Sequence, residues 1–409
     1  MAIVKPFKAI RPTQDKAPFV VSRSYQSYCK RELNANLEFN PFSFLHIINP
    51  GYKFDKQVSG SKRFSLVRNR YLEFLEDDIL KKDEKSGFYL YQIEQDDLIC
   101  CGLFCATSVA DYRNNVIQKH EDTIKRRETL FANYLDTVKF NAEPVLMTYA
   151  DTAEIKALLD TEKEKTPAYH FTTTDRATHK LWVISDQRAT EKIQHQFASV
   201  EKLYIADGHH RSASSDLLSN MFPSENQQEE KRTDYFMSYL IPESEIRIYE
   251  FNRMVKDLNG LSKEEFLIGL DAYFRIENEG NMLYKPTKKH HFCMYLDGEF
   301  YSLYLRRTAY TFTDSLSELD TQILYKTVLE PILGISDLRN DKRIAYGYGK
   351  HNSIRMKNEI DAGRYMVGFN MLPIGISELK RIADDGFVMP PKSTYIEPKL
   401  RSGIAIYEL

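Results

Sequence analysis

The feature that most constrains the fold is an apolar run broken by an Asp-Gly pair and followed by His-His-Arg. Residues 203–206, Leu-Tyr-Ile-Ala, have the composition of a buried strand, and residues 212–218 have that of a helix. Asp207 and Gly208 lie between them, where a tight turn is expected. The sequence therefore predicts a strand, a turn and a helix N-terminus in immediate succession.

This predicted turn has the chemistry of an anion site. Gly208 allows the backbone to approach a ligand closely, and the first N–H groups of a helix favour a negative charge. His209, His210 and Arg211 add donors that suit phosphate, and a guanidinium binds phosphate through two hydrogen bonds. We therefore expect these four residues to bind phosphate. The structural alternative is that Asp207 caps the helix and the Asp-Gly pair is an ordinary turn.

Composition limits the classes of function. The 409 residues suffice for two domains of ordinary size, and the formal net charge of −2 gives no general attraction to nucleic acid. The N-terminus lacks the apolar core of a secretory signal, and no apolar run approaches the roughly 20 residues that cross a bilayer. We expect a cytoplasmic protein that binds neither membranes nor nucleic acid. The sequence leaves open whether it forms a homodimer.

The five cysteines do not indicate a disulfide framework or a metal site. Their number is odd, and the chain is long. Cys100, Cys101 and Cys105 lie in an apolar run, and no second cysteine pair or histidine cluster follows at the spacing of a zinc finger. We expect these three side chains to be buried in a strand.

Helices and strands mix along the chain without a regular strand–helix–strand rhythm. This favours the α+β class, with mixed sheets and flanking helices. We expect a domain at residues 1–255, which carries the predicted turn, and a smaller C-terminal α+β region at residues 256–409. Residues 41–48 read as a turn that leads into a strand, and residues 224–233 read as an exposed loop.

Two pairs of strands and one helix start carry local signals. Residues 87–93 and 98–107 read as an antiparallel pair. Asp297-Gly298 separates two further predicted strands, which is a strong hairpin signal. Ser262 precedes Glu265 by three residues, as in a capping box.

Residues 111–135 have the spacing of one long helix. Ile117, His120 and Ile124 are separated by three and four residues, which places His120 on the apolar stripe. A polar group there needs a partner or a ligand, so a functional and a structural role both stay open. Glu121 falls on another line of the helix, where exposed ion pairs explain it.

The sequence Met-Pro-Pro-Lys-Ser-Thr at residues 389–394 is a second signal. Two prolines stiffen the approach to Lys392, Ser393 and Thr394, a cation and two hydroxyls that suit phosphate or carboxylate. The glycine-rich arm of a P-loop is missing. We expect this tail to return to the predicted turn, whereas a stiff structural loop explains Lys399 equally well.

Several motifs together resemble a bacterial and archaeal family known as the domain of unknown function number 1015. The resemblance spans essentially the whole chain. Where many members have His-Arg, this chain has Asn252-Arg253, which argues against residue 252 as an acid or base. The matching motifs are Pro-Phe-x-Ala-x-Arg-Pro near the start, Asn40-Pro41-x-Ser43-Phe44-Leu45-His46, Lys119-His120-Glu121-x-Thr123, Asp207-Gly208-His209-His210-Arg211 and Met389-Pro390-Pro391-Lys392-Ser393-Thr394.

The Asp-Gly-His-His-Arg motif is also similar to the signature of the ParB and sulfiredoxin superfamily, which includes nucleotide-binding partition proteins and free-serine kinases. This resemblance implies a ParB/sulfiredoxin-like core. It also implies that Gly208, His209, His210 and Arg211 hold a di- or triphosphate. A redox function like that of sulfiredoxin is disfavoured, because no cysteine lies beside the turn.

The resemblance implies nucleotide-dependent phosphoryl transfer involving a small hydroxylated metabolite, with free serine or phosphoserine as the first candidate. Mg²⁺ with ATP or ADP is the expected cofactor, and Arg211 and Lys392 would oppose the developing charge. Asp207 would hold the metal or act as base, and His120 or Glu121 is the other candidate base. The alternative is a non-catalytic nucleotide-binding regulatory protein of the ParB-like type.

Overall fold

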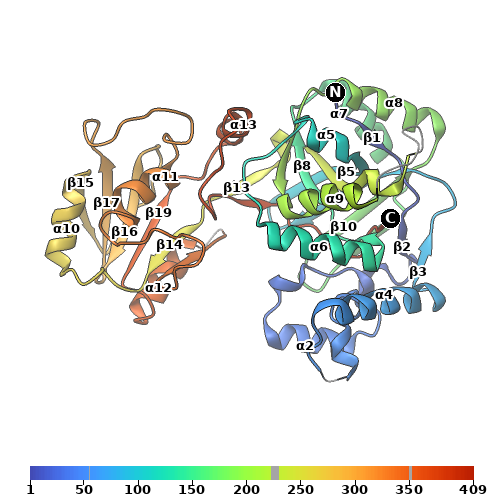
Figure 1. Ribbon diagram of the computed structural model, residues 1–409, viewed down its shortest axis with the longest axis horizontal. Helices are drawn as coiled ribbons and strands as arrows, with labels where there is room; N and C mark the ends of the chain where they lie inside the picture. Colours follow the sequence, from blue (N-terminus) through green and yellow to red (C-terminus); the bar gives the residue numbers. More distant parts are fainter. Residues whose placement is uncertain (55, 223–229, 350–351) are drawn as a thin grey trace. The chain divides into compact units, whose positions relative to one another are not determined.

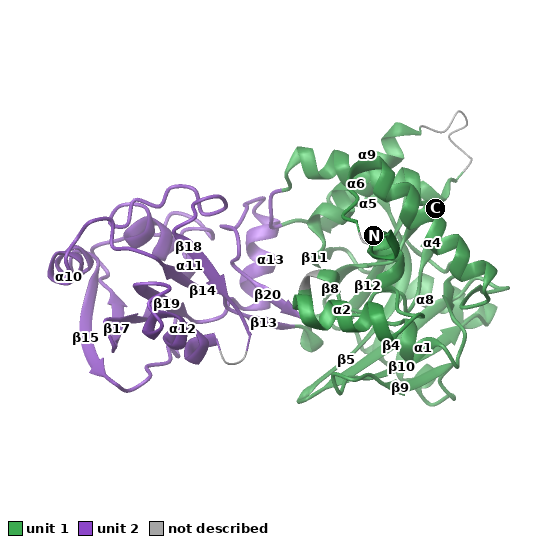
Figure 2. Cartoon of the chain, turned by 90° about the horizontal axis from the view of Figure 1, so that it is seen from below, with its two compact units in different colours: residues 1–119, 123–246, 398–409 green, residues 120–122, 247–397 purple. Residues whose placement is uncertain are grey.

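The computed structural model describes residues 1–54, 56–222, 230–349 and 352–409. They form two compact units, which Figure 2 shows in different colours. Unit 1 comprises residues 1–119, 123–246 and 398–409, and unit 2 comprises residues 120–122 and 247–397. The main division therefore follows residue 246 rather than residue 255, and the last segment belongs to unit 1. Of the loop expected at residues 224–233, residues 224–229 lie outside the described part.

Unit 1 is built on a mixed sheet, which has nine strands in the described part of the chain. Eight strands follow in the order β6, β11, β8, β12, β5, β4, β10 and β9, and β1 pairs with β5. The predicted antiparallel pair β4 and β5 is confirmed. The strands are β1 (Val4–Lys5), β4 (Phe88–Gln95), β5 (Leu98–Ser108), β6 (Ile117–Gln118), β8 (Val145–Tyr149), β9 (Tyr169–Thr172), β10 (Thr178–Ile184), β11 (Leu203–Asp207) and β12 (Tyr235–Pro242).

Helices pack on this sheet through an apolar core. Leu203 and Ile205 alternate along β11 and share one buried cluster with Ile193 and Phe197 of α8. Helices α6 and α9 run side by side (Figure 1). Cys100, Cys101 and Cys105 are buried in β5 with free thiols, as predicted. The helices are α5 (Val109–Arg113), α6 (Lys125–Val138), α7 (Ala153–Lys163), α8 (Gln187–Ala198) and α9 (His209–Met221).

The N-terminal segments form a second apolar cluster of unit 1, and the strand predicted within residues 41–48 is wrong. Those residues contain the short helix α3, in which Leu45 donates its N–H to Oγ of Ser43 at 3.3 Å. Phe44 and Ile47 are both buried, and a spacing of three residues fits a helix. The elements here are β2 (Ile10–Pro12), α1 (Ala17–Val20), α2 (Lys30–Phe39), α3 (Leu45–Ile48), α4 (Gly60–Glu76), β3 (Leu80–Lys82), β7 (Phe140–Asn141), β21 (Tyr407–Glu408) and the 3-10 helices Tyr25–Ser27 and Pro50–Phe54.

The single long helix predicted at residues 111–135 is also wrong. The chain forms α5, a left-handed residue at Asn115 with φ 55°, the short strand β6 and then α6. Ile117 pairs in parallel with Leu203 of β11. This pairing places residues 117 and 118 in a strand, although their apolar spacing also fitted a helix. His120 and Glu121 consequently lie in the loop between β6 and α6 rather than on a helix.

Unit 2 contains an antiparallel sheet with six strands among the described residues, in the order β15, β17, β16, β19, β14 and β18. The predicted Asp297-Gly298 hairpin and the Ser262 capping box are confirmed. The strands are β14 (Asn252–Val255), β15 (Phe274–Gly280), β16 (His291–Leu296), β17 (Glu299–Leu305), β18 (Ile344–Gly347) and β19 (Val367–Met371), and a separate pair joins β13 (Arg247–Tyr249) to β20 (Tyr395–Glu397).

The helices of unit 2 pack against two apolar clusters. Phe266 of α10 and Ile323 of α11 share one cluster with the sheet, whereas Met356 of α12 shares the other. The unit therefore has helices on both faces of its sheet, and the α+β class expected from the sequence is confirmed for the chain. The helices are α10 (Lys263–Asp271), α11 (Asp320–Leu324), the π-helix Tyr325–Leu329, α12 (Asn352–Asp361) and α13 (Ile376–Asp384).

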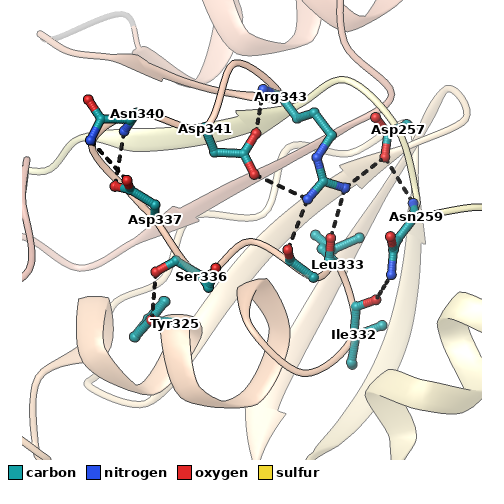
Figure 3. Close-up of polar contacts among 11 residues, drawn as sticks. Asp257, Asn259, Tyr325, Ile332, Leu333, Ser336, Asp337, Asn340, Asp341 and Arg343 are labelled. Carbon is teal, nitrogen blue, oxygen red and sulfur yellow. Dashed lines mark hydrogen bonds and ion pairs between the residues drawn. The ribbon is translucent and has the colours of Figure 1, made fainter.

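Arg343 ties the loop between the π-helix and β18 to the rest of unit 2 (Figure 3). Its guanidinium donates to the carbonyls of Leu333 and Gly334 at 3.0 Å each, and to Asp257 and Asp341 at 3.2 Å each. One side chain therefore connects both ends of this loop to the segment that follows β14. In the part of the chain that is described, no helix is long and apolar enough to cross a membrane.

Candidate functional site

The predicted strand, turn and helix are present, and a single glycine makes the turn. β11 ends at Asp207, Gly208 has φ 108° and ψ 26°, and α9 begins at His209. Residues with a side chain rarely adopt this positive φ. A Cβ atom at residue 208 would also lie 2.8 Å from Nε of Arg211. The backbone therefore favours glycine, and a side chain at this position would also make the guanidinium of Arg211 move.

Arg211 folds back over the turn because two carboxylates hold it. Its Nη2 donates to Oδ2 of Asp207 at 2.7 Å, and its Nη1 lies 3.6 Å from Oε2 of Glu143. The Arg211 side chain is 31% exposed, so that solvent still reaches the guanidinium. An anion that binds Arg211 has to compete with these two carboxylates.

Asp207 interacts with two cations. Besides Arg211, Nζ of Lys399 lies 3.5 Å from Oδ1 of Asp207. Burial alone would raise the pKa of Asp207, but the charges of Arg211 and Lys399 outweigh it and hold the pKa below its usual value. The carboxylate is therefore ionised at neutral pH. The N-cap position of α9 is taken by Gly208, so that Asp207 is not the N-cap residue considered from the sequence.

The two histidines of the turn differ in burial. His209 is 5% exposed, and burial lowers its pKa to about 3. Its imidazole is therefore neutral at physiological pH and adds no positive charge, although it can still donate or accept a hydrogen bond. His210 is partly buried, and its carbonyl accepts a hydrogen bond from Oγ of Ser214 at 2.6 Å. Arg211 and Lys399 therefore supply positive charge at the turn, and the charge of Lys119 also acts on His209.

Small side chains fix the helix that carries the turn. Ser212 donates its hydroxyl to the carbonyl of His209 at 3.0 Å, and Ser215 donates to the carbonyl of Arg211 at 3.0 Å. These bonds satisfy the hydroxyls within α9 and offset the desolvation cost of burying them. The short side chains also allow close packing on α5 and α6. The turn is therefore held on a buried helix rather than on a free loop.

His120 and Glu121 belong to unit 2 by their contacts. The His120 side chain is fully buried, and Glu121 is partly buried. The backbone carbonyl of His120 accepts a hydrogen bond from the N–H of Met389 at 3.0 Å. Two of the motifs singled out in the sequence therefore meet at this backbone contact.

The Met-Pro-Pro-Lys-Ser-Thr tail also lies in unit 2. Lys392 is exposed and adopts a left-handed φ of 58°. Ser393 is 3% exposed, and its Oγ lies 2.7 Å from the Pro390 carbonyl and 3.1 Å from Oγ1 of Thr321. Thr394 is partly buried. Of the tail, Lys392 therefore presents its charge to solvent, whereas Ser393 is engaged inside the protein.

A buried arginine holds the tail in place. Arg253 of β14 is 1% exposed, and its Nη2 donates to the Lys392 carbonyl at 3.1 Å. Its Nη1 donates to the Phe251 carbonyl, and burial lowers its pKa to about 10. The guanidinium therefore stays charged at neutral pH, and within the described residues it makes no ion pair with a carboxylate. Its bonds to backbone carbonyls fix the conformation around Lys392.

Sequence reasoning missed the structural partners of the turn and of the tail. Glu143 comes from the loop between β7 and β8, and Lys399 comes from the segment that returns to unit 1. Arg253 lies in β14, the strand next to the edge strand β18 of its sheet. No local motif predicts the contacts of these three residues, because each contact depends on how segments far apart in the sequence pair.

The comparisons with known proteins are distant. Curated proteins gave no match. A variant of free serine kinase in complex with AMP has 12% identity and a TM-score of 0.38, covering 74% of this chain and 91% of that chain. SbnI with a C-terminal truncation, from Staphylococcus aureus, has 12% identity and a TM-score of 0.37, covering 74% and 85%. A conserved hypothetical protein from Pyrococcus furiosus has 13% identity and a TM-score of 0.35, covering 74% and 94%.

These TM-scores are too low to support a functional conclusion, and the family match is the stronger finding. The family is described as "Protein of unknown function (DUF1015)", and its model matches residues 4–322. The matched residues include the turn at Asp207–Arg211 and end before the tail. Because the match covers more than half of the chain, the protein belongs to the DUF1015 family.

Proposed function

We propose that the chain transfers a phosphoryl group between a nucleotide and a small hydroxylated metabolite, with free serine or phosphoserine as the first candidate. One observation carries the proposal: two cations, Arg211 and Lys399, converge on one carboxylate, Asp207, at the N-terminus of a buried helix. Cations at such a helix end, where the dipole also favours negative charge, suit nucleotide phosphates.

The ion pairs at the turn join two cations to two carboxylates without a ligand. Arg211 and Lys399 contribute two positive charges, and Asp207 and Glu143 contribute two negative charges. A phosphate alone therefore gains little, because it has to displace carboxylates from the cations. A nucleotide bound to a divalent cation carries both negative and positive charge. The protein cations can then pair with its phosphates and the carboxylates with the metal ion, so that no charge is left unpaired.

The donor set at the turn fits magnesium. Asp207 is an ionised carboxylate with a depressed pKa, and Mg²⁺ prefers carboxylate oxygens and retained waters. A carboxylate of low pKa is a weak base, so we assign Asp207 to the metal rather than to proton transfer. When bound, Mg²⁺ neutralises charge on the phosphate oxygens. Gly208, His209, His210 and Arg211 would hold the phosphates.

The remaining roles are assigned as proposals. His120 or Glu121 takes the proton of the acceptor hydroxyl, for which a neutral imidazole or a carboxylate is suitable. The exposed ammonium of Lys392 binds the anionic part of a substrate, and the hydroxyls of Ser393 and Thr394 shape its surroundings. Arg253 positions Lys392 through its carbonyl.

A thermal-shift panel of the full chain tests the proposal. ATP, ADP and AMP are each measured with and without Mg²⁺, and then with serine and phosphoserine. A ligand at about 100 times its Kd adds about 2.7 kcal/mol of stability, which a melting curve detects. We expect the nucleotide effect to need Mg²⁺. Stabilisation by free phosphate equal to that by Mg²⁺–nucleotide contradicts the charge-exchange argument.

Product analysis then separates the enzyme from the regulatory protein. Phosphorus NMR detects whether a phosphoryl group moves between the nucleotide and the metabolite. Such a transfer supports phosphoryl transfer as the activity. Saturable nucleotide binding without turnover over a range of hydroxylated acceptors supports the alternative, a non-catalytic nucleotide-binding protein. Absence of nucleotide binding rejects both.

A further inference from the structure

Unit 2 contains a small cavity of its own. It lies at the start of α11, with Met371 at the end of β19 and Ser393 of the tail in its wall. Its volume of about 20 Å³ suffices for one group of the size of a water molecule. A nucleotide is far too large for it. The polar residues in its wall are Glu250, Lys289, Asp320, Thr321, Glu378 and Ser393.

One carboxylate of the cavity is already neutralised. Glu378 forms an ion pair with Lys289, and its other oxygen accepts the N–H of Gly375 at 3.0 Å in the capping box of α13. Both oxygens of Glu378 are therefore occupied, and the pair contributes no net charge.

Asp320 is buried with only a backbone partner. Its side chain is 8% exposed, and its Oδ1 accepts the N–H of His290 at 2.8 Å. It makes no ion pair and no further hydrogen bond with any residue that the structure describes. Burial raises the pKa of Asp320 to about 7, although the hydrogen bond from His290 acts in the opposite direction. A buried carboxylate in this state gains stability from a cation that binds next to it.

Glu250 is a second carboxylate in the wall of the cavity. It follows β13 in the chain, is partly buried and has no ion pair among the described residues. Burial raises its pKa as well. With the Glu378–Lys289 pair neutral, ionised Asp320 and Glu250 leave the cavity with an excess of negative charge.

We propose that this cavity binds the ammonium group of a small cationic molecule, such as a primary amine. An ammonium group is of the size of a water molecule and donates three hydrogen bonds, which Asp320, Glu250 and the hydroxyl oxygen of Thr321 can accept. A divalent metal suits the site less, because within the described residues no three His, Cys, Asp or Glu side chains at this cavity have their ligand atoms within 4.8 Å of one another. The inference is independent of the phosphotransferase proposal.

The experiment is a calorimetric titration of the full chain with methylammonium chloride, at constant ionic strength held with sodium chloride. We expect saturable binding, and we expect Asp320→Asn to weaken it at least about tenfold, which is 1.4 kcal/mol. Tetramethylammonium, which is larger and donates no hydrogen bond, should not bind. Glu277→Gln, an exposed carboxylate on β15, is the matched control and should bind as the wild type does.

Binding should strengthen between pH 6 and pH 8, because the carboxyl of Asp320 has to be ionised. Glu250, Lys289, His290 and Glu378 are the other titratable groups around it, so the pH series is repeated in Asp320→Asn, where the increase should be smaller. A melting curve shows that each variant is folded. No saturable binding, unchanged affinity in folded Asp320→Asn, or equal affinity for potassium overturns the proposal.

Discussion

The guanidinium of Arg211 lies over Gly208, so close that a Cβ atom at residue 208 would stand 2.8 Å from Nε of Arg211. The backbone at Gly208 also has φ 108°. The same residue therefore controls the direction of the chain and the place of the cation. A side chain at this position has to disturb one of them.

Gly208→Ala should destabilise the chain by about 1–3 kcal/mol, because a non-glycine residue with positive φ is strained and the new methyl group displaces Arg211. Urea unfolding measures the loss. Gly60→Ala is the matched control in unit 1, since Gly60 has φ 62° with nothing within 4 Å of its Cβ position. Equal losses in the two variants would show that the guanidinium contact does not matter.

Arg211→Ala should weaken nucleotide binding at least about tenfold while the chain stays folded, because the side chain is partly exposed and supplies one of the two cations that pair with Asp207. The loss of one charge-assisted bidentate contact corresponds to about 1.5–3 kcal/mol. Titration with Mg²⁺–ATP measures the affinity. Arg188→Ala, an exposed arginine of α8, is the control. Unchanged affinity in Arg211→Ala removes the turn from the site.

Lys392→Ala should lower turnover, or the affinity for the anionic substrate, without changing the melting temperature. The ammonium is exposed, and the conformation of this residue is set through its carbonyl by Arg253. Lys342→Ala, an exposed lysine of the same unit, should have no effect. Steady-state kinetics that match the wild type in Lys392→Ala would exclude the tail from substrate binding.

The buried carboxyl of Asp320 should make the free energy of unfolding depend on pH in the absence of amines. Its usual pKa is 3.8, and burial raises the folded-state pKa to about 7. Between these values the folded chain keeps a proton that the unfolded chain has released, so this group makes stability fall as pH rises from about 4 to 7. Asp320→Asn should be more stable than the wild type at pH 8, on the order of 2 kcal/mol, and nearly equal at pH 4. Urea unfolding at both pH values checks it.

Arg343→Met should destabilise unit 2 by about 1–2 kcal/mol, since it leaves two carbonyls and two carboxylates without their common donor (Figure 3). Partial exposure of the side chain keeps the loss moderate. Arg339→Met, an exposed residue of the same loop, should change the unfolding free energy by less than about 0.5 kcal/mol. Similar losses in both variants contradict the connecting role of Arg343.

Local chemistry made part of the fold predictable. The Asp-Gly pair before His209 gave the turn, Asp297-Gly298 gave a hairpin, and the serine three residues before Glu265 gave a helix start, because each signal depends on neighbours in sequence. The helix predicted at residues 111–135 was wrong, since pairing of Ile117 with β11 outweighed the helical spacing. A distant strand, absent from any local window, decided that segment.

The candidate site was predictable only in part. The sequence indicated Asp207, Gly208 and Arg211 as a turn with a cation, and the structure has them in contact. It did not indicate that Glu143 and Lys399 complete the charge balance, nor that His209 is buried and neutral. Charge pairing and desolvation depend on the packed molecule, so residue types alone do not determine them.

The return of residues 398–409 to unit 1 has a consequence for biosynthesis. Tyr407 and Glu408 pair with β7, and Ile406 forms a bridge with Ile10, so that unit 1 lacks a strand until the whole of unit 2 has left the ribosome. Lys399 reaches Asp207 only at that stage. During translation the inserted unit can therefore fold before unit 1 is complete, and the pairing of Lys399 with Asp207 forms last.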